Sequence, residues 1–212
     1  MTDVFDYKKE YKDLYSPKNE PMEINIPEMI FVAIEGKGNP NDKNGEYQKA
    51  LETIYGIQYT IKMSKKGDYI PNGYFDYVVP PLEGLWWTDK GEFFPIKDKS
   101  KFNWISMIRL PEYVTNDIFE WACAEANRKK KIDTQKAKYL KVKEGLCVQI
   151  MHIGAFDDEP KTIKIMEEYI VKNNFVNDIG QKRRHHEIYL SDPRKIEPSK
   201  MKTIIRIPVK KK

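Results

Sequence analysis

The pentapeptide MIRLP at residues 107–111 recurs almost letter for letter as IIRIP at residues 204–208, near the end of the chain. In each copy apolar residues surround a single arginine, Arg109 or Arg206, and a proline ends the run, which is typical of a β-strand. Similarity at equivalent places along a chain indicates an internal repeat. We therefore predict two related halves, each ending on this strand, with the two arginines as structural ion-pair partners.

The segments before these strands follow the same order in both halves. Residues 29–36 (MIFVAIEG) form a strand-like run that ends in glycine, and a polar loop and a helical stretch over residues 46–63 follow. Residues 146–154 (LCVQIMHIG) also end in glycine, and an acidic loop and a helix to about residue 172 follow. Pro160 suits the first turn of that helix, and the acidic residues beside it complement the positive end of the helix dipole.

Each predicted helix is followed by two further strand signals. They lie at residues 75–79 and 104–111 in the first half, and at residues 185–190 and 203–208 in the second. We therefore predict an α+β fold built from two pseudo-symmetric β-α-β-β units.

The whole chain, residues 1–212, is expected to form a single domain. Its parts are an N-terminal arm, a first repeat, a linking helix and a second repeat, at residues 1–28, 29–111, 112–143 and 144–212. Thr115 or Asn116 is the expected N-cap of the linking helix. Pro80 and Pro81 cannot donate to a sheet ladder, so the PPLEGLWW run that they open is expected at a sheet edge or rim.

The composition excludes several classes of function. Hydrophobic residues make up 40% of the chain and charged residues 33%, and no apolar run approaches the ~20 residues of a membrane span, so we expect a cytoplasmic protein. The net charge of +5 comes largely from lysine-rich runs, and no nucleic-acid-binding motif accompanies them, so direct nucleic-acid binding is not expected. Cys123 and Cys147 are interpreted as reduced core residues, and no metal or other cofactor is predicted.

Several longer segments resemble the GyrI-like small-molecule-binding family. They are residues 73–87 with PPLEGLWW, residues 144–160 (EGLCVQIMHIGAFDDEP), residues 185–195 (HHEIYLSDPRK) and residues 202–206. The resemblance is greatest to free-standing bacterial members without a DNA-binding domain. It implies a ligand groove at the seam of the two halves, where a buried glutamate and aromatic rings hold lipophilic polycyclic or cationic molecules.

The resemblance also implies an activity. Some free-standing relatives are cyclopropanoid cyclopropyl hydrolases, which detoxify duocarmycin- and yatakemycin-type DNA-alkylating agents by adding water across the strained ring. A non-catalytic protein that sequesters or senses drugs remains the alternative. Another branch of the family inhibits DNA gyrase, although no residue of this chain favours that partner.

Strand alternation around Glu187 suggests where the chemistry lies. His185, Glu187 and Tyr189 share one face of the predicted strand, and Ile188 and Leu190 share the other, which should meet the helices. The resemblance places the ligand-site glutamate of the family on this segment, so Glu187 is the candidate catalytic residue, suited to general acid–base work. The alternative interpretation is an exposed strand glutamate in an ordinary salt bridge.

The remaining candidates are side chains that could contact a flat or cationic ligand. Tryptophans and tyrosines offer stacking surface, Glu83 could bind a cation or pair with a lysine, and the tyrosines between Gly67 and Gly73 or just after it could form a lid. For several of the aromatic rings, packing in the core is an equally good or better interpretation. For His152 a structural role is the better interpretation. The candidate ligand-binding residues are Trp86, Trp87, Trp104, Glu83, Tyr55, Tyr69, Tyr74, His152, Phe156 and Tyr189.

Overall fold

The strands of the protein form one antiparallel sheet that closes on itself. In the computed structural model, which describes residues 4–89 and 98–212, the strand order is β4-β1-β3-β2-β6-β7-β5, and β4 also pairs with β7. The strands are β1 (Met22–Lys37), β2 (Leu82–Thr88), β3 (Phe102–Arg109), β4 (Lys138–Ile153), β5 (Phe175–Asn177), β6 (His185–Tyr189) and β7 (Lys202–Lys211). The β4–β7 pairing closes a barrel. The short strand β5 pairs with the C-terminal end of β7.

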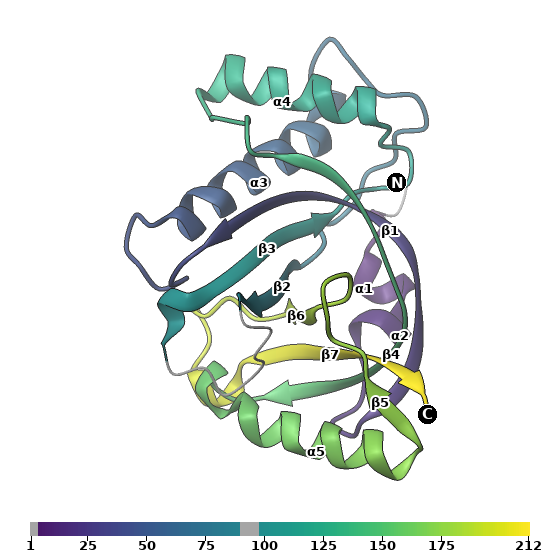
Figure 1. The fold of residues 1–212 in the computed structure, drawn as a ribbon. Coiled ribbons are helices and arrows are strands. Elements are labelled where there is room, and N and C mark those ends of the chain that lie inside the picture. Colours follow the sequence, from purple (N-terminus) through teal and green to yellow (C-terminus); the bar gives the residue numbers. More distant parts are fainter. Residues whose placement is uncertain (1–3, 90–97) are drawn as a thin grey trace.

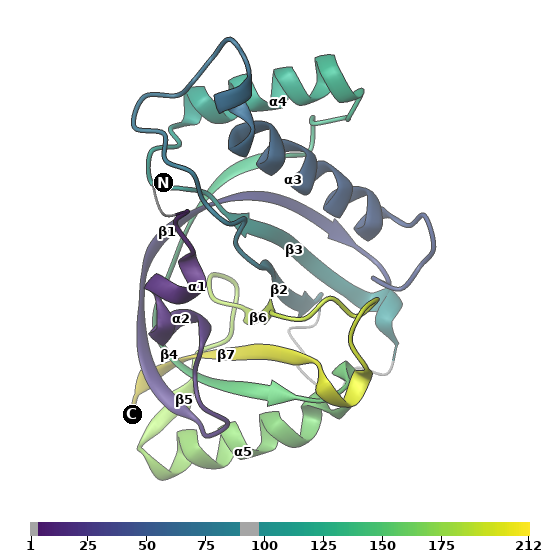
Figure 2. The same ribbon diagram turned by 180° about the vertical axis from the view of Figure 1, so that it is seen from behind.

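The longer helices lie outside the barrel, and the two short N-terminal helices lie near one of its ends (Figures 1 and 2). They are α1 (Tyr7–Glu10), α2 (Lys12–Tyr15), α3 (Glu46–Lys62), α4 (Asn116–Lys130) and α5 (Glu159–Lys172). Short 3-10 turns occur at η1 (Ser64–Lys66), η2 (Lys99–Lys101), η3 (Phe156–Asp158) and η4 (Pro198–Lys200). The orders β1-α3-β2-β3 and β4-α5-β6-β7 confirm the predicted α+β fold of two related units, with β5 as an addition to the second.

Three apolar clusters hold these layers together. Helices α3 and α4 pack on the outer face of the first unit around Ile54 and Trp104, and α5 packs on the second around Met166. The third cluster fills the inner face, where Tyr15 of α2 meets strand residues such as Ile188. Since all these side chains are almost fully buried, the sheet is covered on both faces.

A buried ionic network lies on the inner face. The imidazole of His186 stands 2.9 Å from Glu83 Oε2 and 3.0 Å from Glu144 Oε1, and Arg206 Nη1 lies 3.5 Å from Glu144 Oε2. Burial opposes the charge of His186, but the Glu144 and Glu83 carboxylates raise its pKa to about 9. Arg109 pairs with Glu112 at 2.8 Å, so both repeated arginines are ion-pair partners, as predicted.

Two strand predictions in the first half were wrong. Residues 75–79 form no strand; Tyr77 makes an isolated bridge to Phe5, and its ring is buried. The run that follows the two prolines is β2, which lies between β3 and β6 rather than at an edge. Pro80 and Pro81 come before the paired residues, so their missing N–H groups take nothing from the ladder.

The long strands also start earlier than predicted. β1 begins at Met22, within the expected arm, and β4 begins at Lys138, within the part of the chain assigned to the link between the repeats. The linking helix itself, expected over residues 115 to about 131, is α4 and ends at Lys130. These extensions pair with partners far away in sequence, for example Ile30 with Lys141. Thr115 caps α4 as predicted, because its side-chain oxygen accepts from the Ile118 N–H. Helix α3 begins at Glu46 as predicted and ends at Lys62, one residue before the expected end.

Candidate active site

Strand β6 divides its side chains between the two faces as alternation predicts. Ile188 packs into the inner cluster, and Glu187 lies on the outer face, in the region of α3 and α5. The expectation that the apolar face would meet the helices holds only for the short α1 and α2. Glu187 pairs with Gly84 of β2 and Ile205 of β7, so it lies where the two units meet.

Both oxygens of the Glu187 carboxylate are held. The Tyr189 hydroxyl donates to Oε2 at 2.7 Å, and His185 Nε2 lies 3.0 Å from Oε1. Trp86 Nε1–H donates to the Tyr189 oxygen at 2.9 Å, so a chain of donors runs from Trp86 through Tyr189 to Glu187. Burial lowers the pKa of His185, so this imidazole is neutral and carries its proton on the nitrogen that faces Glu187. At 6% exposure, Glu187 is a fixed acceptor rather than a solvated surface group.

Gly84 makes this arrangement possible. A Cβ at this position would lie 2.6 Å from Trp86 Nε1 and 3.0 Å from the Tyr189 hydroxyl. The absence of a side chain therefore lets the two rings meet over the backbone of β2, directly beside Glu187.

A second buried carboxyl, Glu159, lies beside Glu187. Glu159 is 2% exposed, and burial together with the neighbouring Glu187 carboxylate raises its pKa well above the ordinary range. Glu159 is not among the residues predicted from the sequence. Acidic residues at the start of a helix are explained by their interaction with the helix dipole, so this run did not indicate a site. A signal was present: Glu159 occupies the same helical stripe as the buried Ile163, Met166 and Ile170, which marks it as inward-facing.

Aromatic rings frame the two carboxyls. Tyr47 of α3 stacks on Trp86 with ring centroids 5.7 Å apart and meets the edge of Trp104 at 5.0 Å. Phe156 meets Tyr189 edge-to-face at 5.7 Å, and it is 36% exposed. Of the predicted ligand-binding residues, the structure therefore brings Trp86, Tyr189 and Phe156 to Glu187, with Trp104 behind them.

Two candidates near the tryptophans lie on the inner face instead. Glu83 is fully buried in the ionic network with His186, so it does not join Trp86. Strand alternation puts Trp87 on the same side as Glu83. The guanidinium of Arg184 lies over the Trp87 ring, with its Cζ 4.5 Å from the ring centroid.

The other candidates lie farther along α3 or at the end of β4. Tyr74 donates to the Lys62 carbonyl at the C-terminal end of α3, roughly 22 Å along the helix from Tyr47. Tyr69 packs on Trp121 of α4, and Tyr55 stacks on the exposed Tyr59. Both ring nitrogens of His152 are engaged, by Thr162 and by the Ala155 carbonyl, which fits a structural role.

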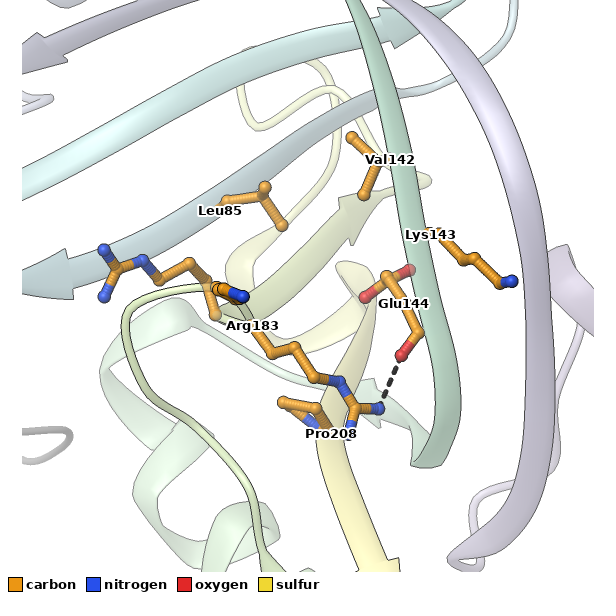
Figure 3. Close-up of a pocket in the computed structure, with 8 residues that line it drawn as sticks. Leu85, Val142, Lys143, Glu144, Arg183 and Pro208 are labelled. Carbon is orange, nitrogen blue, oxygen red and sulfur yellow. Dashed lines mark hydrogen bonds between the residues drawn. The ribbon is translucent and has the colours of Figure 1, made fainter.

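A small pocket opens on the opposite side of the sheet (Figure 3). Four basic residues contribute to its wall, and its lining consists of Leu85, Val142, Lys143, Glu144, Lys182, Arg183, Arg184 and Pro208. The Arg183 guanidinium is already engaged by the carbonyl oxygens of Glu144 and Leu146, so it does not point freely into the pocket. Glu187 and its aromatic frame are not part of this lining.

The protein is a closed barrel of two related units with a buried carboxylate and aromatic rings at their junction. Apolar rings around a few polar groups are typical of sites that bind small molecules. The chain belongs to the GyrI-like small-molecule-binding domain family, whose model matches residues 19–210. The predicted family is thereby confirmed. Among the described residues, 4–89 and 98–212, no helix has the length and apolarity needed to span a membrane.

Solved structures similar to this chain include two from Listeria innocua. One, of an uncharacterised conserved protein, is 47% identical with a TM-score of 0.91, and covers 97% of this chain and 100% of its own. The other, described as a hydrolase, is 46% identical with a TM-score of 0.89 and the same coverage. The C-terminal domain of EcmrR, at 12% identity and a TM-score of 0.53, shares the fold; it covers 91% of this chain and 98% of its own. No curated protein is significantly similar to the chain.

Proposed function

We propose that this protein binds lipophilic polycyclic molecules at Glu187 and hydrolyses the cyclopropane ring of duocarmycin- and yatakemycin-type alkylating agents, in the cytoplasm. The observation that carries the proposal is the Glu187 carboxylate, buried, held through both oxygens and paired with a second buried carboxyl, Glu159. The hydrolase from Listeria innocua, at 46% identity, supports a hydrolytic activity.

The two carboxyls suit the two proton transfers of this reaction. Glu187 accepts a proton from water, whose oxygen attacks the methylene carbon of the strained ring. The carbon–carbon bond breaks, its electron pair enters the conjugated ketone, and the developing phenolate takes a proton from the Glu159 carboxyl. The proton that Glu187 took from water then passes to the Glu159 carboxylate, which restores both groups to their starting states. The net change is the addition of one water.

The aromatic frame supplies the binding surface. Trp86 and Tyr47 form a stacked pair beside Glu187, and offset stacking adds roughly 0.5–1.5 kcal/mol per ring pair beyond burial. Because Glu187 is only 6% exposed, a polycyclic ligand reaches it when neighbouring rings move. Phe156 is partly exposed beside Tyr189, so we place the entry there.

The experiment is incubation with a duocarmycin-type compound followed by mass spectrometry for the gain of one water. Glu187→Gln keeps the shape of the side chain but removes the base, so turnover should fall by about 10²-fold or more. Glu167→Gln, on the exposed face of α5, is the matched control and should retain full turnover.

The same experiment separates the enzyme from a non-catalytic drug-binding protein. The low exposure of Glu187 favours that second function, because a closed aromatic site can retain a ligand without admitting water. Wild-type protein that binds the compound and never releases the hydrated product would establish the binder and refute the hydrolase.

A further inference from the structure

Three buried side chains from one helix and one strand lie close together. Glu159 opens α5, and His185 and Glu187 belong to β6. One donor atom from each, two carboxylate oxygens and one imidazole nitrogen, lie within 4.8 Å of one another. The three residues are 2%, 0% and 6% exposed, so this cluster is not one of the solvated acidic patches that are common on protein surfaces.

The electrostatics of the cluster call for a positive charge. Two carboxyl groups lie close together in a site from which water is almost excluded, and two carboxylate charges in such a place would repel each other strongly. Glu159 Oε1 is buried and finds no hydrogen-bond donor within residues 4–89 and 98–212. A cation bound among the three side chains would satisfy this buried oxygen.

We propose that Glu159, His185 and Glu187 form a binding site for a divalent transition-metal ion, with Zn²⁺ the best match. Zinc takes imidazole nitrogen and carboxylate oxygen at about 2.0–2.2 Å, and three protein ligands leave a fourth position open. His185 Nε2 and Glu187 Oε1, 3.0 Å apart, are already near the donor separation of about 3.3 Å in a tetrahedral site. The ion would take the place of the proton on Nε2, and the imidazole would carry its proton on Nδ1 instead. Glu159 completes the set by a side-chain movement. Ca²⁺ is excluded, because it requires 6–8 oxygen ligands.

The surroundings of the cluster support this assignment. Tyr189 donates to the second oxygen of Glu187, which fixes the carboxylate and leaves Oε1 to face His185. Hydrogen bonds of this kind orient metal ligands in other sites. A divalent ion with two carboxylates and a neutral imidazole has no net charge, which a buried site favours.

Binding of zinc has a consequence for the proposed chemistry. The ion would occupy both carboxyl groups that the hydrolysis uses, so Zn²⁺ should inhibit turnover. Only this consequence rests on the proposed function; the binding itself rests on the three side chains.

The test is equilibrium dialysis of the full chain, stripped with a chelator, against Zn²⁺, followed by measurement of bound metal. Wild type should hold one zinc per chain, and Glu159→Gln should weaken binding by at least about tenfold, since even the loss of a residue that only orients a ligand has such an effect. Glu167→Gln, on the same helix, should bind as wild type does.

A second measurement covers variants that fold poorly. Co²⁺ added to wild type should give a visible absorption spectrum that changes in His185→Asn, with folding of the variant checked by circular dichroism. Wild type that retains no zinc, or Glu159→Gln that binds it with unchanged affinity, would overturn the site. Zinc binding without ring hydrolysis would remove the proposed function alone, and hydrolysis without zinc binding would remove the metal site alone.

Discussion

Tyr189 is the residue that connects the binding surface to the carboxylate. Its hydroxyl accepts from Trp86 and donates to Glu187, and its ring meets Phe156. Burial and the Glu187 carboxylate raise the pKa of Tyr189 well above its ordinary value, so the hydroxyl keeps its proton and remains a donor. A single phenol therefore holds the orientation of the carboxylate and one wall of the site.

Replacement of Tyr189 by phenylalanine tests the role of the hydroxyl, because the ring stays in place. Tyr189→Phe leaves the Trp86 N–H without its acceptor and Glu187 Oε2 without its donor, so the free energy of unfolding should fall by about 1–3 kcal/mol. Urea denaturation followed by circular dichroism measures the change. Tyr59→Phe, at an exposed position on α3, is the control, and an equal loss in both variants would contradict the role of the hydroxyl.

At the scale of elements, the site depends on the contact between β2 and β6. These strands come from different units, and they pair with Gly84 opposite Glu187. Helix α5 brings the second carboxyl to the same place, because Glu159 continues the buried stripe of that helix. The site is therefore assembled from both units, and neither unit contains it alone.

Gly84→Ala tests this contact. The added methyl would require Trp86 or Tyr189 to shift, and overpacking of this kind costs about 1–3 kcal/mol. We expect lower stability in urea and altered tryptophan fluorescence. Gly180→Ala adds its methyl to open space and should be close to neutral. If Gly84→Ala and Gly180→Ala were equally stable, the contact between Trp86 and Tyr189 over β2 would not require a glycine at position 84.

At the scale of the whole molecule, the closed barrel encloses charge as well as apolar side chains. The inner network joins β2, β4, β6 and β7 through Glu83, Glu144, His186 and Arg206. Buried pairs of this kind are costly to break, since the remaining partner stays charged and desolvated. The network thus ties the two units together on the face opposite Glu187.

The network predicts acid sensitivity. Burial acts to raise the pKa of Glu144, but the charges of His186 and Arg206 outweigh it and lower the pKa to about 2. A depressed folded-state pKa means that the stabilisation is complete above the unfolded value of 4.5 and is lost as pH falls toward 2. The expected loss is about 3 kcal/mol.

Urea denaturation of wild type between pH 6 and pH 2.5 measures this loss. Glu144→Gln should be less stable than wild type at pH 6 and should depend less on pH over the same range. If the two proteins lost stability in parallel, Glu144 would not be the group responsible.

The repeat of MIRLP and IIRIP, the glycine-ended strands and the helical stretches are local patterns, and they were enough to predict two related α+β units. Alternation likewise put Glu187 and Tyr189 on one face, because the side-chain period of a strand does not depend on its partners. The long extensions of β1 and β4, the inner position of β2 and the closure of the barrel were decided by pairing between distant segments.

The same distinction applies to the site. Glu187 could be chosen from the sequence, but its neighbour Glu159 lies 28 positions earlier, and only packing of α5 against the sheet brings the two carboxyls together. Glu83 and Trp87 stand close to Trp86 in sequence, but Glu83 joins the inner network and Trp87 packs against Arg184. Local patterns determine which side chains share a face, whereas the contacts between strands and helices determine which faces meet.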